Sequence, residues 1–172
     1  GASGTASADY LIAKVLEDTL GVKINSVVGY ACGSEIDIAV EKGEVLCRGM
    51  TIAPHFGREP FDSWHKKNFD RHIVQTAEKR DPRIGDVPTI YEIFEKENTP
   101  DESRRVADVI LRGGDFGRPM LVGPGTPTDR VNILREAYVK SINNPELIAE
   151  AKKSRMDMEP VTGEQLQALA KR

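Results

Sequence analysis

Short β-branched runs alternate with helix-like segments along the whole 172-residue chain, and this alternation limits the fold more than any other feature. The clearest runs are "KINSVV" (23–28), "EVLCRGM" (44–50) and "RHIVQTA" (71–77). "GRPMLVGPGTP" (117–127) reads as a strand that runs into a turn, and "DMEPVTG" (157–163) as a connector or edge strand. Strands separated by helices are typical of layered folds in which helices cover a sheet. The sequence therefore predicts an α/β fold.

Helices are expected where apolar residues recur every three or four positions. The first runs from Ser7 to Leu20, with Ser7 as its N-cap and Gly21 as its stop. The second opens at the Ser34/Asp37 pair and ends near Gly43. The remaining helices are expected at 60–66, from Asp86 onward, and at 101–112, 128–142, 143–156 and 163–172.

Composition and charge exclude several classes of protein. Hydrophobic residues make up 39% and charged residues 30%, which is typical of a globular chain. The formal net charge of -3 argues against a nucleic-acid surface, which needs a basic patch. No apolar run is long enough to span a membrane, and no signal peptide is visible. Because the chain opens directly on "GASGTASADY", we expect it to be a fragment or a processed product.

The cysteines and histidines predict no metal site. Two cysteines, Cys32 and Cys47, cannot form a disulfide scaffold, although a single pair between them stays open. The three histidines are spaced by ten and seven residues, which matches no common template of metal ligands. Neither a metal nor another cofactor is expected.

Two loops rich in small residues each lead into an expected helix. "GASGTASAD" carries the hydroxyls of Ser3, Thr5 and Ser7, and "GYACGSE" links the first β-branched run to the second helix. Helix N-termini present unpaired N–H groups and the positive end of the helix dipole, so they suit carboxylates or phosphates. An ordinary capped helix explains either loop alone, whereas two such loops together favour an anion-binding cleft.

Cys32 permits a second interpretation. A cysteine at a helix N-terminus gains thiolate character and can act as a nucleophile, provided that a histidine such as His55 or His72 approaches it as the base. The chain has no G-x-S-x-G elbow, H-E-x-x-H sequence or P-loop. The residues therefore favour recognition over catalysis, with a Cys32-dependent enzyme as the alternative.

The chain also resembles the extracytoplasmic solute receptors of the tripartite tricarboxylate transporter family, the Bug-type binding proteins. Those receptors run "GSGSTSH" into a helix and continue with "VPYKGGAPALTDLLGGQVD", to which "GASGTASAD" and "VVGYACGSEIDIAVEKGEVL" are similar in the same order. Two later family motifs resemble "KRDPRIGDVPTIYE" (79–92) and "GPGTPTDRVNILREAYVKSINNPE" (123–146), and the family's ending is echoed by "EPVTGEQL".

The resemblance implies a type II periplasmic-binding-protein fold without the N-terminal half of its first lobe. Residues 1–116 would form the second ligand-binding lobe, and residues 117–172 a return segment to the first lobe. The ligand would be a small carboxylate, and the protein would serve a membrane transporter or a sensor in the periplasm. The ligand-binding residues implied are Ser3, Gly4, Thr5, Ser7, Tyr30, Ala31, Cys32, Gly33 and Ser34.

The resemblance leaves one alternative function open and leads to one further structural expectation. A regulatory ligand-binding module inside a larger protein is an alternative to the receptor. Apolar residues of the C-terminal segment, among them Leu134 and Leu147, would lack the sheet that normally covers them. We therefore expect either dimerisation or an atypical placement of the C-terminal helices.

Overall fold

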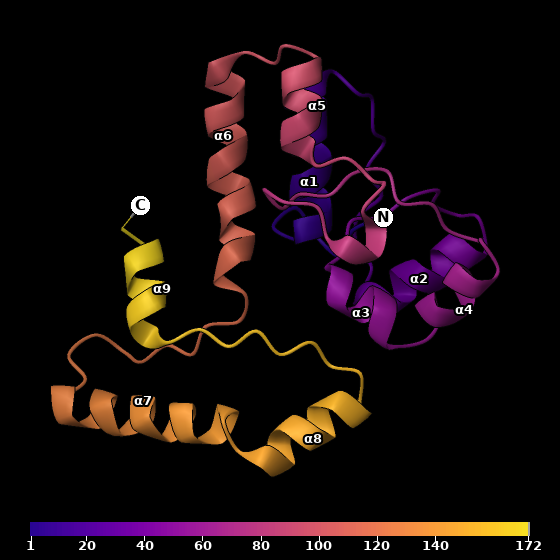
Figure 1. The fold of residues 1–172 in the computed structure, drawn as a ribbon. Coiled ribbons are helices and arrows are strands. Elements are labelled where there is room, and N and C mark those ends of the chain that lie inside the picture. The colour runs from indigo at the N-terminus through magenta and orange to yellow at the C-terminus, as the bar shows by residue number, and fades with distance from the viewer. Residues whose placement is uncertain (172) are drawn as a thin grey trace. The chain divides into compact units, whose positions relative to one another are not determined.

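The computed structural model describes residues 1–171, and at residues 53–54 only their backbone. Helices account for most of this part of the chain (Figure 1). None of the helices described is long and apolar enough to cross a membrane. In chain order the elements are α1 (Ala8–Leu20), α2 (Gly33–Glu41), α3 (Ile52–Gly57), α4 (Phe61–Lys66), the 3-10 turn η1 (Pro82–Ile84), α5 (Ile90–Lys96), α6 (Asp101–Leu111), the 3-10 turn η2 (Arg112–Phe116), α7 (Thr128–Ile142), α8 (Pro145–Lys153) and α9 (Gly163–Leu169).

The expected α/β fold of the periplasmic-binding-protein type is wrong. The described chain is 53% helical and 2% strand, and residues 1–171 form no sheet. Strand-like pairing is limited to two isolated parallel bridges, one between Ala2 and Val28 and one between Gln75 and Thr89. The protein is therefore mostly helical.

In the described part of the chain the β-branched runs form no strands, because they have no neighbouring strands to complete a sheet. A strand is stabilised by the hydrogen-bond ladder and by cross-strand side-chain pairs, neither of which an isolated bridge supplies. Some of their apolar side chains therefore remain in solvent, since Ile73 is 72% exposed and Leu121 is 85% exposed, whereas Val45 is buried. Alternation therefore predicted strands that the described chain does not form, because no local pattern supplies the pairing partners.

The helices, in contrast, lie close to where the sequence places them, because their signals are local. Ser7 caps α1 by accepting a hydrogen bond from the Tyr10 N–H at 3.4 Å. Gly21 ends α1 in the left-handed region at φ +67°, where its N–H bonds to the Glu17 carbonyl. The helices expected at 34–41, 60–66, 101–112 and 128–142 are confirmed within a few residues. Of the helix expected at 163–172, position 172 lies outside the described residues.

One predicted helix begins later than expected. The sequence signal at Asp86 and Pro88 placed the start there, but α5 begins at Ile90. Thr89 and Glu92 form a reciprocal capping box, in which each side chain accepts from the other residue's N–H at 3.2 and 2.7 Å. The two N–H groups satisfied by this capping box place the start of α5 two residues after Pro88.

The chain divides into two compact units. Unit 1 contains Gly1–Thr51 and Trp64–Asp115, and unit 2 contains Ile52–Ser63 and Phe116–Arg172. In unit 1, α1, α5 and α6 pack around a core of four buried residues, which are Val15, Ile90, Phe94 and Ala107. A second cluster lies under α2 and consists of Ile36, Ala39 and Val45, with Tyr30 packed against it.

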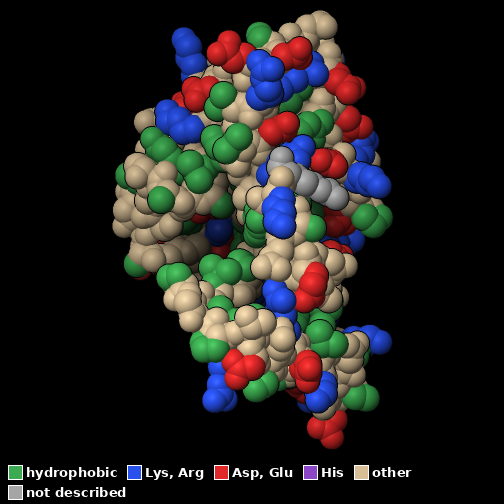
Figure 2. All heavy atoms as spheres, turned by 90° about the vertical axis from the view of Figure 1, so that its left-hand side faces the viewer, with side chains coloured by type: hydrophobic (Ala, Val, Ile, Leu, Met, Phe, Trp, Pro, Cys, Tyr) green, Lys and Arg blue, Asp and Glu red, His purple; other side chains and the backbone are tan. Residues whose placement is uncertain are grey.

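Unit 2 is packed more loosely. No residue of α7 is fully buried, and α8 buries Ala151. Leu134 is 55% exposed and Leu147 43%, so these two apolar residues are only partly covered. Figure 2 shows hydrophobic side chains lying among charged ones on the face it presents.

Tyr91 of α5 makes the stability of unit 1 sensitive to alkaline pH. Burial, followed by the nearby Asp108 carboxylate, raises the pKa of Tyr91 to about 12. Because an unfolded tyrosine titrates near pH ~10, folding favours the neutral phenol. This contribution is fully present below about pH 10 and is lost as the pH rises from there through about 12.

We therefore expect the free energy of unfolding to fall between about pH 10 and 12, and to fall less steeply after Tyr91→Phe. Urea denaturation at closely spaced pH values measures both slopes. Tyr138→Phe on α7 is the matched control and should leave the slope of the parent protein unchanged. Equal slopes in the parent and Tyr91→Phe proteins would contradict the assignment.

Candidate functional site

The two predicted ligand loops lie side by side in unit 1. The Ala2 N–H donates to the Val27 carbonyl at 2.9 Å, and Ala2 forms the parallel bridge with Val28. A Cβ placed on Gly1 would lie only 3.3 Å from Cε2 of Tyr30, so the start of the first loop touches the start of the second. The starts of the two loops are therefore in contact.

The second loop ends in a helix N-terminus with free donors. Gly29 turns the chain at φ +107°, a conformation that favours glycine. Cys32 is the N-cap of α2, and its carbonyl accepts from the N–H groups of Glu35 and Ile36. In residues 1–171, no protein group accepts from the backbone N–H groups of Cys32, Gly33 and Ser34.

A carboxylate already occupies part of this loop. The Glu35 side chain accepts a hydrogen bond from the Ala31 N–H at 2.8 Å. Glu35 is exposed and lies in the first turn of α2, where its negative charge is favourable to the helix dipole. The loop therefore accommodates a carboxylate, here an internal one.

Arg48 and Gly49 connect the first turns of α1 and α2. The Arg48 guanidinium donates to the Gly33 carbonyl at 2.8 Å and forms an ion pair with the buried Asp37. A Cβ on Gly49 would lie 3.2 Å from Cα of Asp9, so the chain passes close against the start of α1. Burial raises the pKa of Asp9, and the nearby Arg48 charge opposes that rise.

The predicted residues of the first loop have mixed roles. The Ser7 hydroxyl donates to the Gly4 carbonyl at 2.8 Å while it caps α1, so its hydrogen-bonding capacity is used internally. Ser3 and Thr5 are exposed, and their hydroxyls bond to no described residue. Gly4 has no neighbour within 4 Å of a Cβ position, which leaves its outer side open.

The second loop has mixed roles as well. Tyr30 is half-buried against the α2 cluster and serves packing. Ala31 is exposed, but its N–H is held by Glu35. A Cβ placed on Gly33 would lie 3.2 Å from a guanidinium nitrogen of Arg48. Cys32, Gly33 and Ser34 are thus the predicted residues that offer free donors together.

Cys32 is an exposed free thiol, as is Cys47. The Cys32 thiol forms no hydrogen bond with any described residue, including a histidine. In this structure the two cysteines are not paired with each other.

Arg48 is the residue that sequence reasoning missed. It lies within "EVLCRGM", which was interpreted as a strand, and a single arginine there gave no functional signal. Nothing in the spacing relates Arg48 to Gly33 or Asp37, since these contacts span 15 and 11 residues.

Neither of the two described hollows in unit 2 is lined by a predicted site residue. No family model, characterised protein or solved structure matches this chain.

Proposed function

We propose that this protein binds a small carboxylate at the first turn of α2, next to the first loop, and acts as a solute receptor rather than an enzyme. The observation that carries the proposal is the set of three adjacent N–H groups, of Cys32, Gly33 and Ser34, which have no partner in the described chain. A carboxylate oxygen placed there would accept two or three hydrogen bonds of the charge-assisted type.

Electrostatics support an anion at this position. The helix dipole of the nine-residue α2 is positive at this end. Arg48 adds a full positive charge beside Gly33, and Asp37 offsets part of it. The carboxylate of Glu35 already bonds to the adjacent Ala31 N–H, so the loop has the geometry for such a group.

Glu35 also limits the affinity that we expect. A ligand carboxylate bound to Cys32–Ser34 would lie near the Glu35 charge, and like charges repel. Ligands are therefore bound weakly unless Glu35 turns outward into solvent, which its exposed position allows.

The wider role follows from the sequence resemblance alone. We propose from it a membrane transport or sensor partner, an extracytoplasmic location, and self-association through the uncovered apolar residues of unit 2.

A thermal-shift screen tests the ligand class. We expect succinate and benzoate to raise the melting temperature, and putrescine and glucose to leave it unchanged, because free N–H donors favour anions. At ligand concentrations about 100 times Kd the stabilisation is about 2.7 kcal/mol, or several degrees in a domain of this size. Stabilisation by amines or sugars alone would contradict the proposal.

A further inference from the structure

The turn that follows α4 brings two histidines and an aspartate together in unit 1. His65 lies in the last turn of α4. Asn68 adopts φ +49°, a left-handed conformation that asparagine tolerates better than most residues. The Phe69 N–H then donates back to the Trp64 carbonyl at 2.9 Å, as in a Schellman motif. The chain therefore turns sharply after α4, and Asp70 and His72 follow this turn directly.

Trp64 fixes the turn to the rest of unit 1. Its side chain is buried, and its indole N–H donates to the Glu41 carboxylate of α2 at 2.8 Å. The ring of Phe69 packs on it, with 5.1 Å between the two ring centroids. Side chains on an anchored turn are better preorganised for a ligand than side chains on a free loop.

The ligand atoms of the three side chains lie close to one another. A ligand nitrogen of His65 and a carboxylate oxygen of Asp70 are within 4.8 Å of each other, and the ring centroids of His65 and His72 are 6.4 Å apart. A tetrahedral zinc ion holds its ligand atoms about 3.4 Å apart, and the centroids of two imidazoles bound to it about 5 Å apart. Small rotations of these side chains, of which His65 is exposed and the other two half-buried, close the difference.

We propose that His65, Asp70 and His72 bind a zinc ion or a similar late divalent transition metal. Imidazole and carboxylate are among the ligands that zinc prefers, whereas calcium and magnesium prefer oxygen ligands alone. Three protein ligands leave a coordination position for water or a small ligand. The sequence predicted no metal site because it was judged on the spacing of the histidines, which does not show that the turn returns Asp70 to His65.

The neighbouring charges limit the affinity. Lys66, Lys67 and Arg71 are exposed and lie next to the three ligands in sequence, so their positive charges repel a metal ion. We therefore expect a Kd on the order of 10 µM rather than the much tighter binding of a buried structural site.

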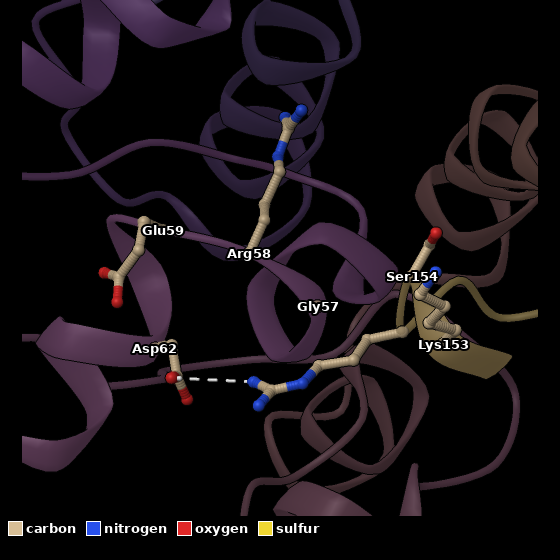
Figure 3. A pocket seen from close by; sticks show the side chains of 7 residues that line it. Gly57, Arg58, Glu59, Asp62, Lys153 and Ser154 are labelled. Atoms are coloured by element: carbon tan, nitrogen blue, oxygen red, sulfur yellow. Dashed lines mark ion pairs between the residues drawn. The ribbon is translucent and has the colours of Figure 1, made fainter. Parts of the chain in front are cut away.

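The hollow in unit 2 that Figure 3 shows offers no comparable set of ligands. The described residues that line it, 57–59, Asp62 and 153–155, include no histidine and no cysteine. Asp62 forms an ion pair with Arg155 at 3.6 Å, the dashed line in Figure 3. Zinc is therefore expected to leave this hollow empty, which makes Ser154 on its rim a suitable negative reporter.

Calorimetric titration with zinc chloride, in a buffer that does not bind metals, tests the proposal. We expect one saturable site, and calcium chloride should give no saturable heat. In NMR spectra of the labelled protein the ring signals of His65 and His72 should move with the same Kd, while the Ser154 amide should not. His65→Gln, Asp70→Asn and His72→Gln each remove one ligand and should each weaken zinc binding at least about tenfold.

Two controls separate this site from other zinc ligands. Asp101→Asn neutralises an exposed acid in the first turn of α6 and should leave Kd unchanged. Cys32→Ser/Cys47→Ser removes both free thiols and should also leave Kd unchanged. The absence of saturable binding, zinc binding that the thiol variant abolishes, or a Kd that His65→Gln does not raise would overturn the proposal. Because His65 is exposed, His65→Gln remains informative even if a variant of a half-buried ligand fails to fold.

Discussion

Phe94→Ala is expected to lower the free energy of unfolding by about 3–5 kcal/mol, the range measured when a large aromatic side chain is removed from a packed core. Phe94 is 1% exposed and belongs to the cluster where α1, α5 and α6 meet. Removal of the Phe94 ring leaves a cavity between Val15, Ile90 and Ala107. The surrounding helices relax only partly into such a cavity, so most of the lost packing is not recovered.

Chemical denaturation measures this loss, with Val109→Ala as the control on α6. Val109 is 79% exposed, so its truncation should change the free energy by no more than about 0.5 kcal/mol. A loss below about 1 kcal/mol for Phe94→Ala would show that the helices of unit 1 do not depend on this core.

Arg48→Met is expected to destabilise unit 1 by about 3–5 kcal/mol, because it leaves a buried carboxylate without its partner. Asp37 is 4% exposed, and the Arg48 guanidinium is the group with which it forms an ion pair. Methionine keeps much of the apolar stem, so the effect reports the charge rather than lost packing.

The double variant Arg48→Met/Asp37→Leu separates these contributions. Replacing both members of a buried pair by apolar residues is often neutral, so stability should return close to that of the parent protein. Arg80→Met, which breaks an exposed ion pair with Glu92, should cause a much smaller loss. A double variant no more stable than Arg48→Met would argue against an unpaired Asp37 charge as the cause.

The helices could be predicted from the sequence because their determinants are local. Ser7 and Gly21 delimit α1 through a cap and a left-handed stop that involve residues within four positions. The absence of a sheet from residues 1–171 could not be predicted in this way, since a strand depends on partners that no local pattern contains. The run 71–77 was expected as a strand, which is wrong: its pairing is limited to the Gln75–Thr89 bridge.

In the candidate site, too, local features could be predicted from the sequence and tertiary contacts could not. Gly29, Gly33 and Ser34 indicated a bend that leads into a helix N-terminus, and the structure contains it. The electrostatics of the site could not be predicted, because Arg48 reaches Gly33 across 15 residues and Glu35 returns to Ala31 only in the folded conformation. Spacing reveals which groups are present, whereas tertiary contacts decide which of them remain free.

A site-resolved titration with succinate tests the carboxylate proposal most directly. In the parent protein we expect the Cys32, Gly33 and Ser34 amides to shift together and to saturate. Glu35→Gln should tighten Kd by about fivefold, since removing a charge within reach of the ligand relieves about 1 kcal/mol of repulsion. The Glu44→Gln control, which removes an exposed acid beyond the end of α2, should leave Kd unchanged. Saturable succinate shifts that avoid these three amides, or a Kd that Glu35→Gln does not tighten, would contradict the proposal that α2 holds the ligand.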